Sequence, residues 1–265
     1  MAGKIVYSIF TKPWGALTLD ELAGLIAEIG ADGVEFPLRD GFQVEPGNAE
    51  RDLPKLVRAL DKRSLKVYSV ASSPVEGVFA ACAECGVPLI RIMLGHDLAG
   101  DYLETEKDMR RQIERFLPLC ERYGVKVGVQ QHCGPGVNNS MEVLHLLGGY
   151  DPKLVGGVWD AAHSGLAGEE PEQAIDIIWS HLALVNFKNA TYIRANGPEA
   201  ALARYDRHFT TGSQGLCSWE RAVSHLKKRG YTGNICMPAE YTDIDNTVSY
   251  IKQDLKYLKR LVGDY

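Results

Sequence analysis

The feature that most constrains the fold of this chain is a regular alternation of short β-branched segments with longer amphipathic segments. Such alternation predicts parallel strands joined by crossover helices. Eight strand–helix units, at an average spacing of about 33 residues, predict a closed (β/α)8 TIM barrel formed by residues 1–265 as a single domain. The expected strands are 4–10, 33–37, 66–72, 87–94, 126–132, 154–160, 183–189 and 233–240. The expected helices are 18–30, 52–63, 75–85, 105–123, 140–147, 171–180, 218–230 and 245–261.

The alternative is an open, doubly wound sheet. That fold has fewer units as a rule and often carries a glycine-rich phosphate loop, and the sequence contains neither G-x-G-x-x-G nor G-x-x-x-x-G-K. Residues 190–217 form the one long segment without a clear period, and we expect a functional or mobile loop there. The ends of the first expected helix are the best defined. Thr18 and Glu21 form a capping-box pattern at its start, and Gly30 is the residue at which it should end.

Charge and cysteine content narrow the class of protein. The net charge is −5, and a general binder of nucleic acids or anionic membranes needs a basic excess instead. No apolar stretch approaches the roughly 20 residues of a membrane span, and the start shows no secretory pattern. The six cysteines are too sparse for a disulfide scaffold. We therefore expect a cytoplasmic protein without nucleic-acid or membrane partners.

Polar residues gather where the expected strands end. In a barrel of this kind the carboxyl ends of the strands surround the active site, so these side chains should converge. A single histidine at a strand end is better explained as a structural loop residue than as a functional one. Several histidines at the same end of the barrel together indicate a functional site. The residues at the strand ends are Thr11, Lys12, Trp14, Glu35, Ser72, His96, Gln130, His132, Asp160, His163, Asn186, Lys188 and Glu240.

Two of these residues, Asp160 and Glu240, give a more specific indication of function than the others. Asp160, in the segment WDAAH, could direct its carboxylate and the imidazole of His163 to the barrel axis as ligands of a divalent cation. The alternative is that Asp160 caps a short turn. Glu240 ends an interior strand in a confined polar pocket, which calls for a partner of opposite charge.

These residues give the chain a family resemblance. It resembles the xylose isomerase-like barrel superfamily, the sugar phosphate isomerase/epimerase group, over nearly its whole length. The resemblance rests on the segments GADGVEF, VGVQQHCG, WDAAHSGLAG, VNFKN and PAEY. It implies an enzyme that acts on a small carbohydrate, polyol or keto-acid by removing a proton next to a carbonyl. A sugar-binding or partner subunit without activity, a dehydratase, and a homo-oligomer remain open.

The resemblance also implies a metal site with substitutions. The family uses Glu, Asp, His and Glu, and the matching positions here are Gln130, Asp160, Asn186 and Glu240. Two amides in place of a carboxylate and an imidazole favour Mn²⁺, Mg²⁺ or Ca²⁺ over Zn²⁺. Weaker binding follows from the lower ligand charge, and a site that holds no metal is the alternative.

The same substitutions bear on mechanism. The family's epimerases are thought to use one glutamate on each face of the substrate, and Gln130 cannot accept a proton. We therefore expect one-base chemistry, with Glu240 as base and His163 or Lys188 as acid, in an isomerisation or a loss of water. The expected substrate-binding residues are His132, His96, Glu35, Trp14 and Arg207, although Trp14 could instead pack in the core and Arg207 could lie in a solvated loop.

Overall fold

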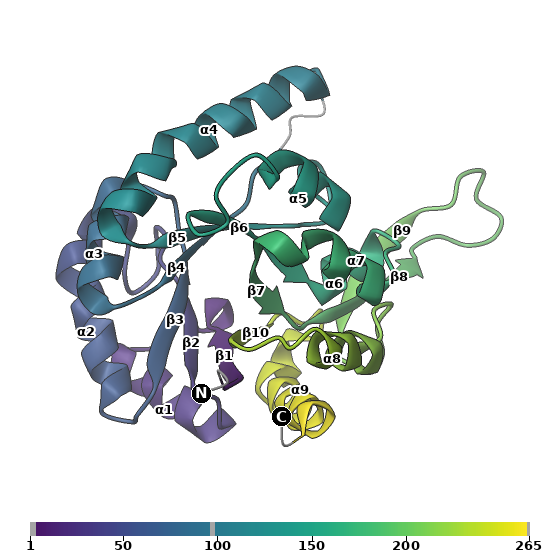
Figure 1. Ribbon diagram of the computed structural model, residues 1–265. Helices are drawn as coiled ribbons and strands as arrows, with labels where there is room; N and C mark the ends of the chain where they lie inside the picture. Colours follow the sequence, from purple (N-terminus) through teal and green to yellow (C-terminus); the bar gives the residue numbers. More distant parts are fainter. Residues whose placement is uncertain (1–3, 96–98, 264–265) are drawn as a thin grey trace.

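The structure, a computed structural model, describes residues 4–95 and 99–263. Eight parallel strands close into a barrel in the order β1-β10-β7-β6-β5-β4-β3-β2, as Figure 1 shows, which confirms the predicted (β/α)8 architecture. The barrel strands are β1 (Val6–Phe10), β2 (Gly33–Pro37), β3 (Lys66–Ala71), β4 (Leu89–Ile92), β5 (Lys126–Gln130), β6 (Val155–Asp160), β7 (Leu182–Asn186) and β10 (Asn234–Pro238).

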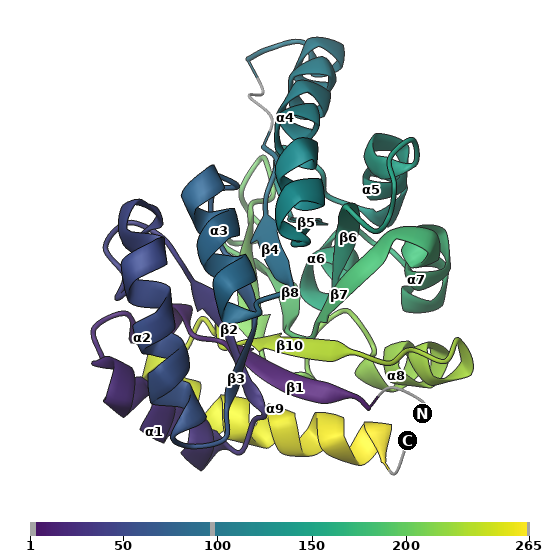
Figure 2. The same ribbon diagram turned by 60° about the vertical axis from the view of Figure 1, so that its left-hand side comes forward.

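The longer helices lie outside the strands (Figure 2), and helices that follow one another round the barrel contact each other. They are α1 (Leu19–Ile29), α2 (Ala49–Asp61), α3 (Glu76–Cys85), α4 (Tyr102–Tyr123), α5 (Ser140–Leu147), α7 (Pro171–Ile178), α8 (Trp219–Lys228) and α9 (Thr247–Val262). The ends of α1 follow the sequence pattern. Thr18 and Glu21 form a reciprocal capping box, and Gly30 takes the left-handed conformation at φ 86°.

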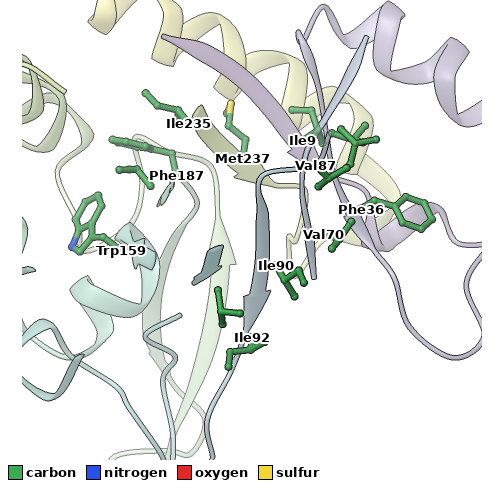
Figure 3. Close-up of a cluster of buried hydrophobic side chains, with 14 of the residues drawn as sticks. Ile9, Phe36, Val70, Val87, Ile90, Ile92, Trp159, Phe187, Ile235 and Met237 are labelled. Carbon is green, nitrogen blue, oxygen red and sulfur yellow. The ribbon is translucent and has the colours of Figure 1, made fainter. Parts of the chain in front are cut away.

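The main hydrophobic core fills the space between the strands and the surrounding helices (Figure 3), with Phe36, Trp159 and Phe187 fully or almost fully buried. Each such side chain stabilises the fold by roughly 1.5–3 kcal/mol on burial. A smaller apolar cluster, which includes Phe10 and Val158, packs separately from the main core. At Gly128 an added Cβ would lie 2.7 Å from Val158, so β5 has to stay small there.

The structure corrects three expectations about local structure. Residues 190–217 are not simply an irregular loop, because β8 (Asn189–Arg194) and β9 (Tyr205–Thr210) pair as an antiparallel hairpin. The hairpin was overlooked because much of it is exposed and lacks the alternation of a half-buried strand. A short helix, α6 (Ala161–Leu166), follows β6 directly where none was expected, and α2 begins at Ala49 instead of residue 52. Within the described ranges, no helix is long and apolar enough to cross a membrane.

Candidate active site

A small cavity of about 40 Å³ lies at the carboxyl ends of the barrel strands. This volume is too small for a whole polyol, so a substrate would have to extend beyond it. Among the described residues that line it, four are cationic and one is a carboxylate. The lining residues are Phe10, Lys12, Arg39, Arg91, Met93, Gln130, His132, Asn186, Lys188, Pro238 and Glu240.

Glu240, just after β10, is held by two ammonium groups. The Lys12 Nζ donates to Oε1 at 2.6 Å, and the Lys188 Nζ donates to Oε2 at 3.0 Å. Burial favours the neutral acid, but Lys188 and Lys12 outweigh it and hold the pKa of Glu240 well below its usual range. Burial would lower the pKa of Lys188, yet Asp160 and Glu240 raise it. Glu240 therefore has the partner charges that the sequence called for.

Asp160 is fully buried at the end of β6 and is saturated with donors. Its Oδ1 accepts the backbone N–H groups of Ala162 and His163 at the start of α6, so the capping interpretation is confirmed. Its Oδ2 accepts the side-chain amides of Gln130 at 2.7 Å and Asn186 at 3.3 Å. The two amides at the positions of the family's Glu and His thus donate to this carboxylate and orient it.

Sequence reasoning missed Arg91, a buried guanidinium on β4. It donates from Nε to Glu35 Oε1 at 2.8 Å, and through Nη1 it contacts Gln130 Oε1. Burial would lower the pKa of Arg91, but Glu35 outweighs it and raises the pKa. The signal was present in the sequence, because Arg91 is the one charged residue in the apolar segment VPLIRIML.

The peptide of Cys133 sets the tautomers of two histidines whose rings lie 4.1 Å apart. His132 Nδ1 lies 3.0 Å from the Cys133 carbonyl oxygen, which can only accept, so Nδ1 carries hydrogen and Nε2 is left as an acceptor. The Cys133 N–H donates to His163 Nδ1 at 3.2 Å, so His163 carries its hydrogen on Nε2. Burial and the charge of Lys188 lower the pKa of both histidines, which keeps the rings neutral.

The β8–β9 hairpin closes the histidine side of the mouth. Arg207, on β9, donates from Nη1 to the Cys133 Sγ at 2.7 Å. Phe209, on the same strand, stands 4.9 Å from the Lys188 ammonium in a cation–π contact. The hairpin therefore contacts Cys133 and Lys188, and Arg207 lies off the wall of the small cavity.

Several predicted residues lie off the cavity wall. Glu35 is fully buried beneath Arg91 and Ser69, so it positions Arg91 and does not face the cavity. Trp14 packs against the hydrophobic core, as the alternative interpretation held. His163 is fully buried behind His132, and its Nε2 has no hydrogen-bond partner in the described structure. His96 lies outside the described residues.

The oxygen ligands that the family resemblance implies do not fit a divalent cation in this arrangement. Both oxygens of Asp160 accept N–H groups, and both oxygens of Glu240 accept ammonium groups. The Gln130 oxygen contacts Arg91, which leaves only Asn186 Oδ1 buried and without a partner among the described atoms. The buried Lys188 ammonium already supplies positive charge between the two carboxylates. A divalent cation here would face this charge at close range.

A second group of side chains could hold a metal ion. His132, Cys133 and His163 each offer a ligand atom, and these atoms lie within 4.8 Å of one another. Nitrogen and sulfur ligands suit softer ions such as Zn²⁺, in contrast to the oxygen set expected from the sequence. The guanidinium of Arg207 on the Cys133 sulfur competes with a cation at this position.

The chain is similar to two inosose dehydratases. It is 28% identical over 165 residues to that of Bacillus licheniformis, an alignment that covers 59% of this chain and 55% of that enzyme. It is 26% identical over 260 residues to that of Clostridium beijerinckii, which covers 84% of this chain and 86% of that enzyme.

Two solved structures show the same fold. The D-psicose 3-epimerase of Clostridium cellulolyticum H10, with D-tagatose, has a TM-score of 0.73 at 13% identity and covers 97% of this chain and 99% of that one. The IOLI protein, with a binding zinc atom, has a TM-score of 0.72 at 17% identity and covers 99% of each chain.

The family match extends over most of the chain. Residues 23–261 match the family described as xylose isomerase-like TIM barrel, which confirms the resemblance seen in the sequence. The alignment with the Bacillus licheniformis enzyme spans only about half of that enzyme's length. The chain belongs to the xylose isomerase-like TIM barrel family.

Proposed function

We propose that this protein is a dehydratase that removes water from a small keto-polyol through an enolate. The observation that carries the proposal is the composition of the mouth cavity. Glu240 is the one carboxylate among the described lining residues, and it is surrounded by cationic side chains. The position where the family's second glutamate would act holds Gln130. One proton acceptor beside several cations suits enolisation followed by elimination better than a two-base epimerisation.

Lys188 and Lys12 stabilise negative charge both before and after the proton moves. In the free protein they neutralise the ionised Glu240. When Glu240 takes the proton next to the substrate carbonyl, the negative charge passes to the carbonyl oxygen. The same two ammonium groups can then turn to that oxygen, so the cavity keeps its charge balance throughout the step. This arrangement also raises the basicity of Glu240 at the moment when the lysines leave it.

The loss of water follows from the same groups. The enolate re-forms its carbonyl, the bond from the β-carbon to its hydroxyl breaks, and a carbon–carbon double bond forms. The protonated Glu240 returns its proton to the leaving hydroxyl, which departs as water. His132 lines the cavity and offers the lone pair of Nε2, so it can accept a hydrogen bond from a substrate hydroxyl. His163 acts behind it as a positioning residue.

The similarity to inosose dehydratases supports this reaction and suggests a first substrate. No step of the proposed reaction runs through the divalent metal that the family resemblance implies, because the carboxylate oxygen atoms of that site are already paired. Glu240, once protonated, takes the acid role for which the sequence also suggested His163 or Lys188.

The experiment that tests the proposal is incubation of inosose with the protein in D₂O, followed by proton NMR. Loss of the signal next to the carbonyl, together with new signals from a CHD group, is the expected result, because the hydroxy-enone formed first is the enol of a diketone and takes up deuterium from the solvent. Exchange of the proton without signals from a CHD group would instead place the protein with the isomerases and epimerases. Absence of both changes, for inosose and for a panel of keto-hexoses, would contradict the proposal.

A further inference from the structure

A second cavity adjoins the mouth cavity and is much larger. Its volume is about 500 Å³, against about 40 Å³ for the mouth cavity. Arg39, Arg91 and Met93 line both cavities, so the two are neighbours that share a wall. A substrate whose reacting carbon sits beside Glu240 would reach the larger space by passing these three shared side chains.

The lining of this larger cavity has a consistent chemistry. Its polar lining residues within the described part of the chain carry positive charge or neutral donors, and none is acidic. Arg39 and Arg91 enter from the barrel side, and Arg115 enters from α4. The full set is Arg39, Ser72, Ser73, Pro74, Val75, Arg91, Ile92, Met93, Leu94, Gln112, Arg115 and Phe116.

Two of these groups lack the partners that their burial calls for. Arg39 is half-buried, and its Nε donates only to the Ala71 carbonyl oxygen at 3.3 Å, with no carboxylate paired to it in the described ranges. Burial lowers its pKa, and the charge of Arg91 lowers it further. The Ser72 hydroxyl is buried, with the residue 7% exposed, and it has no hydrogen-bond partner among the described atoms. The buried hydroxyl costs free energy until an acceptor arrives, and the half-buried guanidinium beside a second cation favours an anion.

Helix α3, which follows β3, adds to the positive electrostatic potential in the larger cavity. Ser73, Pro74 and Val75 lead into α3 and line the cavity wall, so α3 begins at this wall. Val75, at the N-cap, forms no side-chain capping hydrogen bond. The amino end of a helix carries a partial positive charge and free N–H groups, which favour an anion.

We propose that the larger cavity is a subsite for an anionic oxygen group, a carboxylate or a phosphate, at the far end of the substrate. The inference rests on the proposed function for the reacting end and adds to it a substrate class, a keto-polyol that carries an acid group. Arg39 and Arg115 pair with the anion, and the Ser72 hydroxyl donates to it. The guanidinium groups can form two parallel hydrogen bonds with a planar or tetrahedral oxyanion. The overall charge of −5 does not oppose this, because the cations are concentrated at the cavity.

Binding of three matched polyols tests the subsite without requiring turnover. Sorbitol, gluconate and sorbitol 6-phosphate share a six-carbon chain and differ at one end, which is neutral, a carboxylate or a phosphate. We expect at least one of the two anions to bind about tenfold or more tightly than sorbitol in calorimetry, since charge-assisted hydrogen bonds exceed neutral ones. Which anion binds better identifies the acid group. Equal binding of all three, or binding of none at 10 mM, would overturn the subsite.

Variants locate the binding. Arg115→Met should reduce the preference for the anion several-fold and Arg39→Met should abolish it, whereas Arg39→Lys should keep part of it. Arg111→Met is the matched control, because Arg111 lies on the same helix, is exposed, and pairs with Asp108 away from the cavity. An anion preference that survives both Arg39→Met and Arg115→Met would overturn the assignment. Turnover of a neutral keto-polyol by the unaltered protein in D₂O tests the reacting end alone, so the failure of either proposal is distinguishable from that of the other.

Discussion

Two carboxylates that lie close together in the sequence, the partly buried Glu240 and the buried Asp254, have opposite electrostatic environments. Glu240 at the barrel mouth is paired with two lysines, and its pKa is held far below the usual range. Asp254, on α9, is 2% exposed and accepts only the Gly212 N–H and the Tyr241 hydroxyl among the described groups. Burial without a cation raises the pKa of Asp254 to about 6. Burial of a carboxylate therefore does not by itself identify the active site. The distinguishing feature of Glu240 is that its two ammonium partners can turn from the carboxylate to a substrate oxygen.

The most direct test of this difference between the two carboxylates is to replace each of them in turn with its neutral amide. Glu240→Gln should lower kcat/KM on a confirmed substrate by roughly 10²–10⁴-fold, because the proton acceptor is lost. Asp254→Asn, the matched control, should leave kcat/KM within about twofold, since this site is remote from proton transfer. Steady-state kinetics on both proteins provide the measurement. Full activity of Glu240→Gln would show that the base is another group, with His132 as the next candidate.

A second change removes a cation and keeps the carboxylate. Lys188→Met should lower kcat by about 10²–10³-fold, because the enolate oxygen loses its charge partner. It should also lower the free energy of unfolding by about 3–5 kcal/mol, because Glu240 and Asp160 are left without their buried counter-ion. Lys12→Met, at the exposed end of the same carboxylate, is the control and should cost less than about 1 kcal/mol. Equal effects of the two variants would contradict the special role of the buried ammonium.

The stability of the second region should respond to pH in a definite direction. The pKa of Asp254 rises from 3.8 to about 6 on folding, so the folded state binds the proton more tightly than the unfolded chain. Its contribution to stability is therefore present below pH 4 and is lost as the pH rises through 6. Asp254→Asn keeps acceptors and donors for Gly212 and Tyr241 and removes this loss, so it should stabilise the protein by up to about 3 kcal/mol above pH 7. Urea unfolding at about pH 3 and pH 7.5 measures the difference, which should nearly vanish at the lower pH.

The comparison also shows how far sequence reasoning reaches. The eight-unit alternation predicts the barrel, because the apolar residues of each segment recur with the spacing that places them on one face of a strand or of a helix. It also brings Gln130, Asp160, Asn186, Lys188 and Glu240 to one mouth, because strand ends in a closed barrel must meet. The identity of each side chain's partner depends on packing between distant strands, and local patterns do not encode it.

Arg91 illustrates the limit. It is a single charge in an apolar segment, and its pairing with Glu35, 56 residues away, follows only once β2 and β4 have taken their places in the barrel. The same holds for the hairpin, because Arg207 reaches Cys133 across 74 residues of sequence. The sequence correctly required a partner charge for Glu240, yet it could not show that two lysines supply it.

The smallest expected effect is that of metal removal. The mouth balances its carboxylates with N–H groups, ammonium groups and a guanidinium, which leaves one amide oxygen free. Dialysis against EDTA should therefore change the melting temperature by less than about 1 °C, because a ligand contributes stability only if it binds the folded state. Stoichiometric metal in the purified protein, with loss of stability on its removal, would contradict this and restore the expected Mn²⁺, Mg²⁺ or Ca²⁺ site.

The converse experiment is Gln130→Glu combined with Asn186→His, which rebuilds the family's ligand types beside Asp160 and Glu240. Co²⁺ should then give ligand-field absorbance with the double variant and not with the unaltered protein, since the added carboxylate and imidazole outcompete Lys188 for the shared anions.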